Sequence, residues 1–483
     1  MKPIDANFSD QFLFPPALED FVPADHPARF IREFVEYLVA DGVKFQWSEG
    51  GPDGRPPYSA ALLCRVWLYA YLVGLTSSRK VELACRDSAG MMWLAGMNRP
   101  DHNTLWRFWT ANQDGIKKVF LASVKLACEA GMIGMLLHAV DGTKLQSRGS
   151  NRKAWHRRDL EKLLASLDRK ITTLEGEIAA AGSGVEGEGF AIPERLANAK
   201  ALRQEIAARV KTLTEIGRDH YNPHESDAEP MKLASGGTRL GYNGQVVVDQ
   251  TATIIVAADL VTEAHDQGQL HPMLDQVEAN LGVLAEETVA DGGYNTEQTI
   301  VEAEQRERAI TLAAGPSDAE AHPDAPYHAS RFSYDQLIDT YRCPAGQSLT
   351  CRGRKNRGEG RTVFEYRSDA CPACPVRAQC SQSKKGRTIE RSPHYAAVER
   401  HRSKRRSDAG RARLKKRGAV VERVFANIKS NQGFVRFTVG SQAGAAAQWS
   451  WICTAHNLRI LCARWLREVR STFQNPALLA LSP

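Results

Sequence analysis

Hydrophobic residues recur at helical spacing through the first 130 residues of the chain. One stripe holds Phe30, Ile31, Phe34 and Leu38, and further apolar segments span about residues 59–74, 79–86 and 90–94. Apolar residues three or four positions apart form one face of an α-helix. We therefore expect short helices, one of them starting near Leu105 with Asp101 or Asn103 as its cap. This pattern suits a helix-turn-helix DNA reader, and a plain helical bundle fits it equally well.

Two longer helical patterns lie within residues 155–216. The first contains Leu160, Leu163, Leu167, Ile171, Leu174 and Ile178, and the second contains Leu196, Ala199, Leu202, Ile206, Val210 and Leu213. A glycine-rich link at residues 181–187 separates them. The spacing predicts two antiparallel helices that form a coiled-coil hairpin. A scaffold, a dimer contact and a DNA clamp are all compatible roles.

Strand patterns alternate with helices between residues 135 and 313. We expect strands at residues 135–140, 241–249, 253–261, 287–290 and 309–313, and helices at about 269–281 and 296–308. The first strand should end in a turn at Asp141-Gly142, and the fourth should end at Asp291-Gly292. This order predicts an α/β fold with a mixed sheet.

The last third of the chain divides into an irregular and a helical part. Residues 315–420 are polar, rich in Gly and Pro, and carry cysteines, whereas long helices are expected from about residue 419 onward. We therefore divide the chain into a helical domain (1–130), a core (131–314), a cysteine-rich basic insertion (315–417) and the C-terminal helices of the core (418–470).

The charge distribution favours a polyanionic partner. The net charge is only +7, but residues 401–417 contain nine Lys and Arg against one Asp. Such a concentration, which includes Arg405, Arg406 and Arg417, suits DNA, although a solvated basic loop has the same composition. The apolar fraction of 43% is typical of proteins that bury real cores. We expect no signal peptide, no membrane span and reduced thiols, hence a cytoplasmic protein.

Two aspartates at strand ends are candidate metal ligands. Asp141 and Asp291 each follow an apolar strand and precede glycine. Such carboxylates are held rigidly and remain open to solvent, as Mg²⁺ requires, although Asp-Gly is also a common turn. Residues 420–429 form an amphipathic helix on which Glu422 and Lys429 project along one face, and an ordinary surface pair is the alternative. We interpret Asp249 as a weaker candidate.

The late cysteines have the spacing of a metal knuckle. Cys371 and Cys374 are separated by two residues, and Cys343 and Cys380 would complete a Cys₄ site. Because the segment has few apolar residues, a structural Zn²⁺ would supply the stability that packing cannot. Free thiols or a redox pair remain alternatives. The remaining cysteines, apart from a spare Cys351, are interpreted as core residues of helices: Cys64, Cys85, Cys128, Cys453 and Cys462.

The motifs HAVDGTK, GYNGQ-x-x-VD, ADGGY and VERVFANIK occur in this order. Together they resemble the bacterial insertion-sequence transposases of the DDE class, over about residues 5–465. The resemblance implies a ribonuclease-H-like core with Asp141, Asp291 and Glu422 as catalytic ligands of two Mg²⁺ or Mn²⁺ ions. It also implies that Lys429 contacts transposon-end DNA. The family's Tyr before the Glu is absent here, and Arg417 is the candidate for its Arg.

The resemblance implies a transposase that cleaves transposon ends and transfers strands into target DNA. Its partners would be double-stranded DNA, namely terminal inverted repeats and target, and a second copy of the chain, in the nucleoid of a bacterial cytoplasm. A structure-selective nuclease on the same fold would cut but not join. A DNA-binding regulator without chemistry would bind but not cut. Asp227 and Asp266 are interpreted as loop residues.

Overall fold

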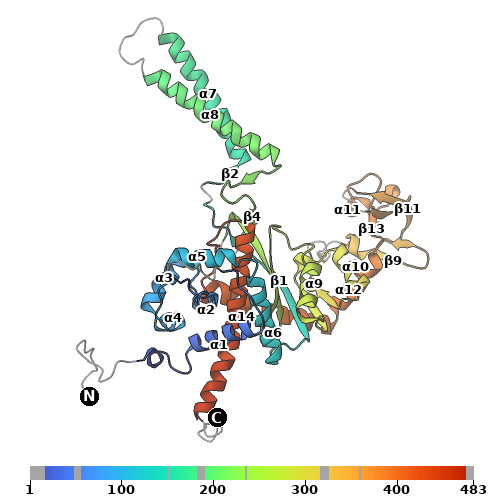
Figure 1. The fold of residues 1–483 in the computed structure, drawn as a ribbon. Helices are drawn as coiled ribbons and strands as arrows, with labels where there is room; N and C mark the ends of the chain where they lie inside the picture. Colours follow the sequence, from blue (N-terminus) through green and yellow to red (C-terminus); the bar gives the residue numbers. More distant parts are fainter. Residues whose placement is uncertain are drawn as a thin grey trace, which may run out of the picture.

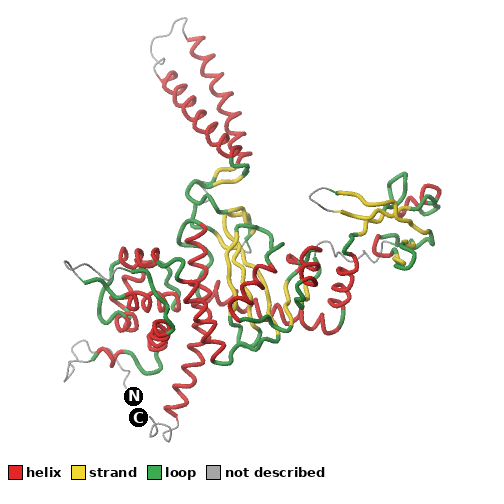
Figure 2. The backbone as a smooth tube through the Cα atoms, turned by 45° about the vertical axis from the view of Figure 1, so that its right-hand side comes forward, coloured by secondary structure: helices red, strands yellow, loops and turns green. Residues whose placement is uncertain are grey.

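The computed structural model describes residues 17–47, 56–150, 153–181, 191–233, 236–315, 326–357 and 362–474. The first residues of the chain and the glycine-rich link at 182–187 lie outside this set. Among the described helices, none is both long and apolar enough to cross a membrane. The fold is mixed α/β, with a helical N-terminal region beside a mixed sheet (Figures 1 and 2).

The N-terminal helices match the hydrophobic stripes of the sequence. They are α1 (Pro27–Ala40), α2 (Ala60–Leu72), α3 (Ser78–Asp87), α4 (Ala89–Leu94), α5 (His102–Ala111) and α6 (Ile116–Glu129). The predicted stripe of α1 is buried at all four positions. Asp101, rather than Asn103, caps α5, because its Oδ1 accepts hydrogen bonds from the N–H groups of Asn103 and Thr104.

The main sheet is an antiparallel meander extended by two parallel strands. Its strands are β1 (Leu137–Gln146), β4 (Glu229–Lys232), β5 (Thr238–Asp249), β6 (Ile255–Val261), β7 (Glu287–Ala290) and β8 (Ile310–Leu312). The order is β4-β5-β1-β7-β8, and β6 also pairs with β5. β1 is antiparallel to β5 and parallel to β7, which is parallel to β8.

The prediction that the first strand ends at Asp141 is wrong. β1 continues to Gln146, because its antiparallel pairing with β5 runs from His138↔Asp249 to Gln146↔Gly241. Only the parallel pairing with β7 stops at Val140, opposite Ala290. Asp141 therefore follows the end of the β1–β7 ladder in the middle of a longer strand.

Helices cover this sheet and join it to the N-terminal region. α9 (Leu270–Leu281) contacts β5 and β6, and α10 (Glu297–Gln305) contacts α9. α13 (Asp408–Ala426) contacts β1, β7 and β8, and continues into a π-helical turn, Asn427–Asn431. α14 (Gln442–Gln474) contacts β6, α6 and α2, so it lies between the helical region and the sheet (Figure 2).

The predicted coiled-coil hairpin is present. α7 (Arg157–Ala181) packs against α8 (Ala191–Glu215), and the short strands β2 (Trp155–His156) and β3 (His220–Tyr221) pair at its base. Its apolar side chains form two clusters separate from the main core, one of which contains Leu160, Leu167, Ile206 and Leu213. The hairpin projects away from the body of the molecule (Figure 1).

Residues 315–417 are more regular than expected. Five strands form a second sheet in the order β13-β12-β11-β10-β9: β9 (Ser333–Asp335), β10 (Thr340–Arg342), β11 (Ser348–Asn356), β12 (Thr362–Arg367) and β13 (Ile389–Arg391). A small core of Phe332, Tyr341, Leu349, Tyr366 and Ile389 holds it together. The short α11 (Arg377–Cys380) follows β12.

The late helices begin earlier than predicted. α12 (Tyr395–Arg406) and the first half of α13 carry the basic run, which is therefore helical and not a loop. Two side chains of the basic run form ion pairs with the sheet. Lys404 Nζ lies 2.8 Å and Arg413 Nη1 lies 3.5 Å from carboxylate oxygens of the buried Glu287. The sequence pattern did not predict this packing, because these helices contact the sheet partly through ion pairs and not through a stripe of apolar side chains.

Candidate active site

The register of two parallel strands brings Asp141 and Asp291 together. Val140 lies opposite Ala290, and each strand continues directly into its aspartate. Neighbouring strands are about 4.8 Å apart, so the two carboxylates leave the ladder side by side. Asp141 Oδ1 accepts a hydrogen bond from the N–H of Gly142, and Asp291 Oδ1 accepts one from Gly293, both at 2.8 Å. These bonds fix the orientation of both carboxylates.

A third aspartate, Asp266, joins this pair from the loop between β6 and α9. Its Oδ1 accepts hydrogen bonds from Lys144 Nζ, Asn243 Nδ2 and Gln245 Nε2, all at 2.8 Å. A Cβ atom on Gly142 would lie 2.7 Å from this Oδ1, and one on Gly293 would lie 3.4 Å from Asp266 Oδ2. Asp266 therefore touches the glycine that follows Asp141 and the one near Asp291.

Sequence reasoning assigned Asp266 to a loop and missed this role. The available signal was the polar pair Asn243 and Gln245 in the GYNGQ motif. Both side chains are fully buried on β5 although a buried strand is normally apolar. Two buried amides need partners, and an acid after the next strand supplies one.

The aspartate cluster concentrates negative charge. Burial raises the pKa of Asp141 to about 6, and the carboxylates of Asp291 and Asp266 act in the same direction, whereas Arg417 opposes the shift. The buried phenol of Tyr294 has its pKa raised mainly by burial and further by all three aspartates. Its hydroxyl donates to Gln245 Oε1. Clustered carboxylates of this kind suit a hard divalent cation, which would relieve their repulsion.

Burial opposes ionisation of Asp266, but hydrogen bonds from Lys144, Asn243 and Gln245 outweigh it, so its pKa lies below the ordinary value. Asp266 is therefore more firmly ionised than an ordinary aspartate.

The third predicted ligand, Glu422, is carried by a helix and not by the sheet. It is exposed on α13, and in the described part of the chain no hydrogen bond or ion pair joins it to Asp141 or Asp291. Across the described residues, no group of three or more His, Cys, Asp or Glu side chains is placed to hold a metal ion. The structure thus brings together two of the three predicted acids.

Arg417 on α13 pairs with Asp141, and the charge of Asp141 also acts on Lys429. Arg417 Nη1 lies 2.9 Å from Asp141 Oδ2, and both side chains are about four-fifths buried. Burial lowers the pKa of Lys429, in the π-helical turn, while the charge of Asp141 acts in the opposite direction. Arg417 therefore neutralises the charge of Asp141 in this structure.

The other weighed acids have structural partners. Asp249 is fully buried and accepts hydrogen bonds from the N–H groups of Gly134, Met135 and Thr251, so it closes turns at the end of β5. Asp227 Oδ2 accepts the N–H of Gln442 at 3.2 Å. Among the four basic residues expected to hold DNA, Arg405 is only 9% exposed and Arg406 faces solvent.

The four cysteines predicted as zinc ligands surround one small cavity. Cys343, Cys371, Cys374 and Cys380 line a space of about 20 Å³, roughly that of a single water molecule. A Cβ on Gly386 would lie 3.1 Å from Cys371 Sγ, so this glycine keeps the space open. Burial raises the pKa of the Cys371 thiol, as do Cys343 and Cys380. Among the helical cysteines expected in the core, Cys128 is exposed, so that prediction was wrong.

Comparison with known families fits this architecture. Residues 342–462 match the model described as a transposase DDE domain, and residues 16–111 match the model described as a transposase domain (DUF772). Together the two matches indicate an insertion-sequence transposase of the DDE class. No curated protein matches the chain.

The DDE-domain match contains the cysteine cavity, Arg417, Glu422 and Lys429, and the second match contains α1 to α5. The aspartate cluster lies between the two matched regions. The transposase families associate the chain with DNA transposition, and DDE transposases generally use divalent metals such as Mg²⁺. The carboxylate-rich cluster around Asp141 has the donor chemistry that such metals require.

Proposed function

We propose that the chain cleaves phosphodiester bonds at transposon ends and transfers the freed 3′-hydroxyl into target DNA. The observation that carries this proposal is the pairing of Asp141 and Asp291 at the end of the β1–β7 ladder. A ribonuclease-H-like core is supported by the sheet itself, an antiparallel meander of β1, β5 and β6 followed by parallel β7 and β8.

In the active complex, Asp141, Asp291 and Glu422 would hold two Mg²⁺ or Mn²⁺ ions, which supply Lewis-acid stabilisation of the attacking and leaving oxygens. Arg417 now neutralises Asp141. In this proposal Arg417 leaves Asp141 and pairs with a DNA phosphate, while Glu422 approaches from the same helix. The adjacent π-helical turn supports a functional rearrangement here, since such turns are frequent at functional sites.

The remaining residues position the DNA. Lys429, Arg406 and the outer face of α12 and α13 would contact phosphates. Asp266 would orient Lys144 and Gln245 around the reacting groups. Water attacks the phosphodiester directly, so the reaction needs no covalent enzyme intermediate and no serine or tyrosine nucleophile.

The parts of the chain would divide the work. We assign residues 1–130 to reading the terminal inverted repeats and residues 131–314 with 418–470 to catalysis. Within the basic insertion 315–417, the helical residues 395–417 would serve the catalytic core, because α12 contacts β8 and α13 contacts β7. Two ends must be paired, so the active form would be a homodimer or a larger assembly, acting on nucleoid DNA in the cytoplasm.

A structural Zn²⁺ is proposed for the cysteine cavity. Four cysteines line one small space and have the donor chemistry of a closed structural site, although among the described residues their side chains are not gathered as a metal cluster. The five-residue apolar core of this sheet is small, and metal binding would add the missing stability. Such a site has no open position, so it would contribute to folding and not to chemistry.

The test uses labelled transposon-end DNA with the purified protein, in Mg²⁺ or EDTA. We expect Asp141→Ala to bind the ends as the wild type does and to lose metal-dependent cleavage by several orders of magnitude. Glu161→Ala, an exposed acid on the distant hairpin, serves as the matched control. Wild-type cleavage by Asp141→Ala would remove this residue from the site. Cleavage without strand transfer would favour the nuclease instead.

A further inference from the structure

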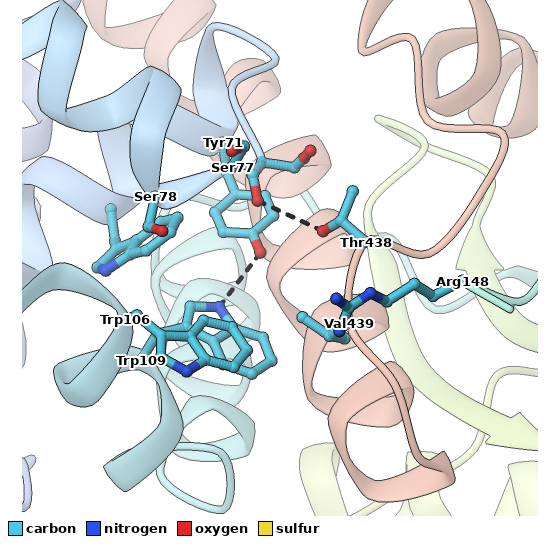
Figure 3. A pocket seen from close by; sticks show the side chains of 10 residues that line it. Tyr71, Ser77, Ser78, Trp106, Trp109, Arg148, Thr438 and Val439 are labelled. Atoms are coloured by element: carbon cyan, nitrogen blue, oxygen red, sulfur yellow. Dashed lines mark hydrogen bonds between the residues drawn. The ribbon is translucent and has the colours of Figure 1, made fainter. Parts of the chain in front are cut away.

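A cavity lies where the N-terminal helices meet the core (Figure 3), and its described lining residues include none of the three clustered aspartates. Its volume is about 300 Å³, at the lower end of the range for small-molecule sites. It is lined from α2, the start of α3, α5, the end of β1 and the loop before α14: Trp67, Tyr71, Thr76, Ser77, Ser78, Trp106, Trp109, Arg148, Thr438 and Val439.

Two stacked tryptophans form a rigid platform in this cavity. The rings of Trp106 and Trp109 are 5.3 Å apart and nearly parallel, at 8°. Trp109 is buried, and its Nε1 donates a hydrogen bond to the Tyr71 hydroxyl at 3.2 Å (Figure 3). Trp106 is 40% exposed. A large indole that is held in place on one side and uncovered on the other offers a stacking surface.

Polar side chains line the cavity beside the two tryptophans. The Arg148 side chain is exposed and extends toward the cavity (Figure 3), and within the described chain no hydrogen bond or ion pair engages its guanidinium. Its backbone is fixed, because Arg436 donates to the carbonyls of Ser147, Arg148 and Gly149. Ser77 and Ser78 add two hydroxyls. Arg148 is the one charged residue among the described lining residues, so the cavity favours an anionic ligand.

The cavity and the aspartate cluster are connected along the chain by β1. Arg148 follows Asp141 by seven residues along β1 and its extension, a distance of roughly 20 Å at strand spacing. Lys429 and Arg436 lie on the segment that leads from α13 to Thr438. A DNA strand that leaves the active site would cover this distance in about six nucleotides.

We propose that this cavity binds an unpaired nucleobase of the DNA strand, stacked on Trp106, with an adjacent phosphate on Arg148. The inference rests on the proposed DNA activity and adds a site for a base outside the duplex. Enzymes that act on DNA commonly hold displaced bases between aromatic side chains, and stacking tolerates any base because each has a π face. A peptide segment is the competing occupant, and the exposed guanidinium of Arg148 argues for the nucleotide.

The test compares single-stranded and duplex DNA binding by three variants. With a thymidine homopolymer, we expect Trp106→Ala to bind about tenfold more weakly than the wild type. Trp106→Phe should retain most of the affinity, since it keeps a flat ring, and Arg148→Ala should reduce the salt dependence. Blunt duplex binding should change little in Trp106→Ala. Because Trp106 is largely a surface residue, its variants should fold, which circular dichroism checks.

A set of frayed DNA ends, each with one abasic nucleotide at a different position of one strand, locates the bound base. At one position, the missing base should weaken DNA binding by the wild type but should not weaken binding by Trp106→Ala any further. Equal single-strand affinity of the wild type and Trp106→Ala would overturn the nucleobase site, and a peptide that protects Trp106 would replace it. If the wild type still cut ends, the proposed function would survive. A wild type that bound no DNA would overturn both.

Discussion

Asp266 is held by more hydrogen bonds than either aspartate at the ladder end. Lys144, Asn243 and Gln245 all donate to its Oδ1, and a second distance of 3.0 Å joins Lys144 Nζ to Oδ2. These donors come from β1 and β5, the strands that surround Asp141. In our proposal, Asp266 is thus a positioning residue that fixes the surroundings of Asp141 and Asp291.

We expect Asp266→Asn to lower metal-dependent cleavage by about 10- to 100-fold, as for other partners that orient metal ligands. The amide keeps the size of the side chain but removes the charge that pairs with Lys144. Cleavage rates measured against Mg²⁺ concentration should show a weakened metal dependence, which a purely structural role would not produce. Glu263→Gln, on the same loop, is the control. Unchanged metal dependence in Asp266→Asn would refute the role.

At this scale the sequence predicted Asp141 and Asp291 because each follows an apolar strand, a local pattern. It could not predict Asp266, because that role depends on Asn243 and Gln245 on a strand some twenty residues earlier. Glu422 was placed correctly on a helix. Its distance from the aspartates depends on how α13 packs on the sheet, which no local pattern encodes.

Among the elements, the long helices and the strands β5 to β8 of the main sheet were predicted well, whereas the short strands β9 to β13 were not. The hairpin of α7 and α8 and the helices of the N-terminal region follow the apolar spacing of the sequence. The sheet of β9 to β13 does not, because its strands are short and its core is a few aromatic residues from distant positions. The sequence did show the cysteines of this segment, and their positions coincide with this second sheet and the residues that follow β12.

Replacing one cysteine tests whether a metal completes this element. Our proposal gives about one equivalent of bound zinc per wild-type chain. We expect Cys374→Ser to lose this zinc. Because metal binding and folding are coupled, residues 333–391 of the variant should also become sensitive to proteolysis. Cys351→Ser, on β11 and outside the cavity lining, should keep its zinc. Elemental analysis together with limited proteolysis measures both. A wild-type protein purified without zinc, yet resistant in this region, would contradict the site.

Across the whole molecule, α14 connects the helical region to the sheet. Trp449 Nε1 donates to the Gln245 carbonyl at 3.2 Å. Asn457 forms two hydrogen bonds with the backbone of Ile255 and one with Ser123 on α6. Gly244 makes this contact possible, since a Cβ there would lie 2.9 Å from the Trp449 ring. The same helix therefore stabilises both parts and supports the strand that carries Asn243 and Gln245.

A buried histidine on α14 makes this connection sensitive to pH. His456 is 2% exposed and lies between two polar partners, Asn427 Nδ2 at 2.8 Å from its Nδ1 and the Thr253 carbonyl at 2.9 Å from its Nε2. Burial lowers its pKa to about 4, and nearby Arg459 acts in the same direction, whereas the Thr253 carbonyl opposes it. The ring is therefore neutral in the folded protein near pH 7.

The sign of the effect follows from the lowered pKa. Between pH 6.5 and about 4 the unfolded chain binds a proton at His456 that the folded chain does not, so the free energy of unfolding falls as the pH falls. By pH 5 the loss from this residue is about 2 kcal/mol. Thermal unfolding at pH 7 and pH 5 should show a larger drop in Tm for the wild type than for His456→Gln, which cannot take up the proton. His224→Gln, which replaces an exposed histidine, should behave as the wild type, and equal drops in all three proteins would exclude His456 as the source.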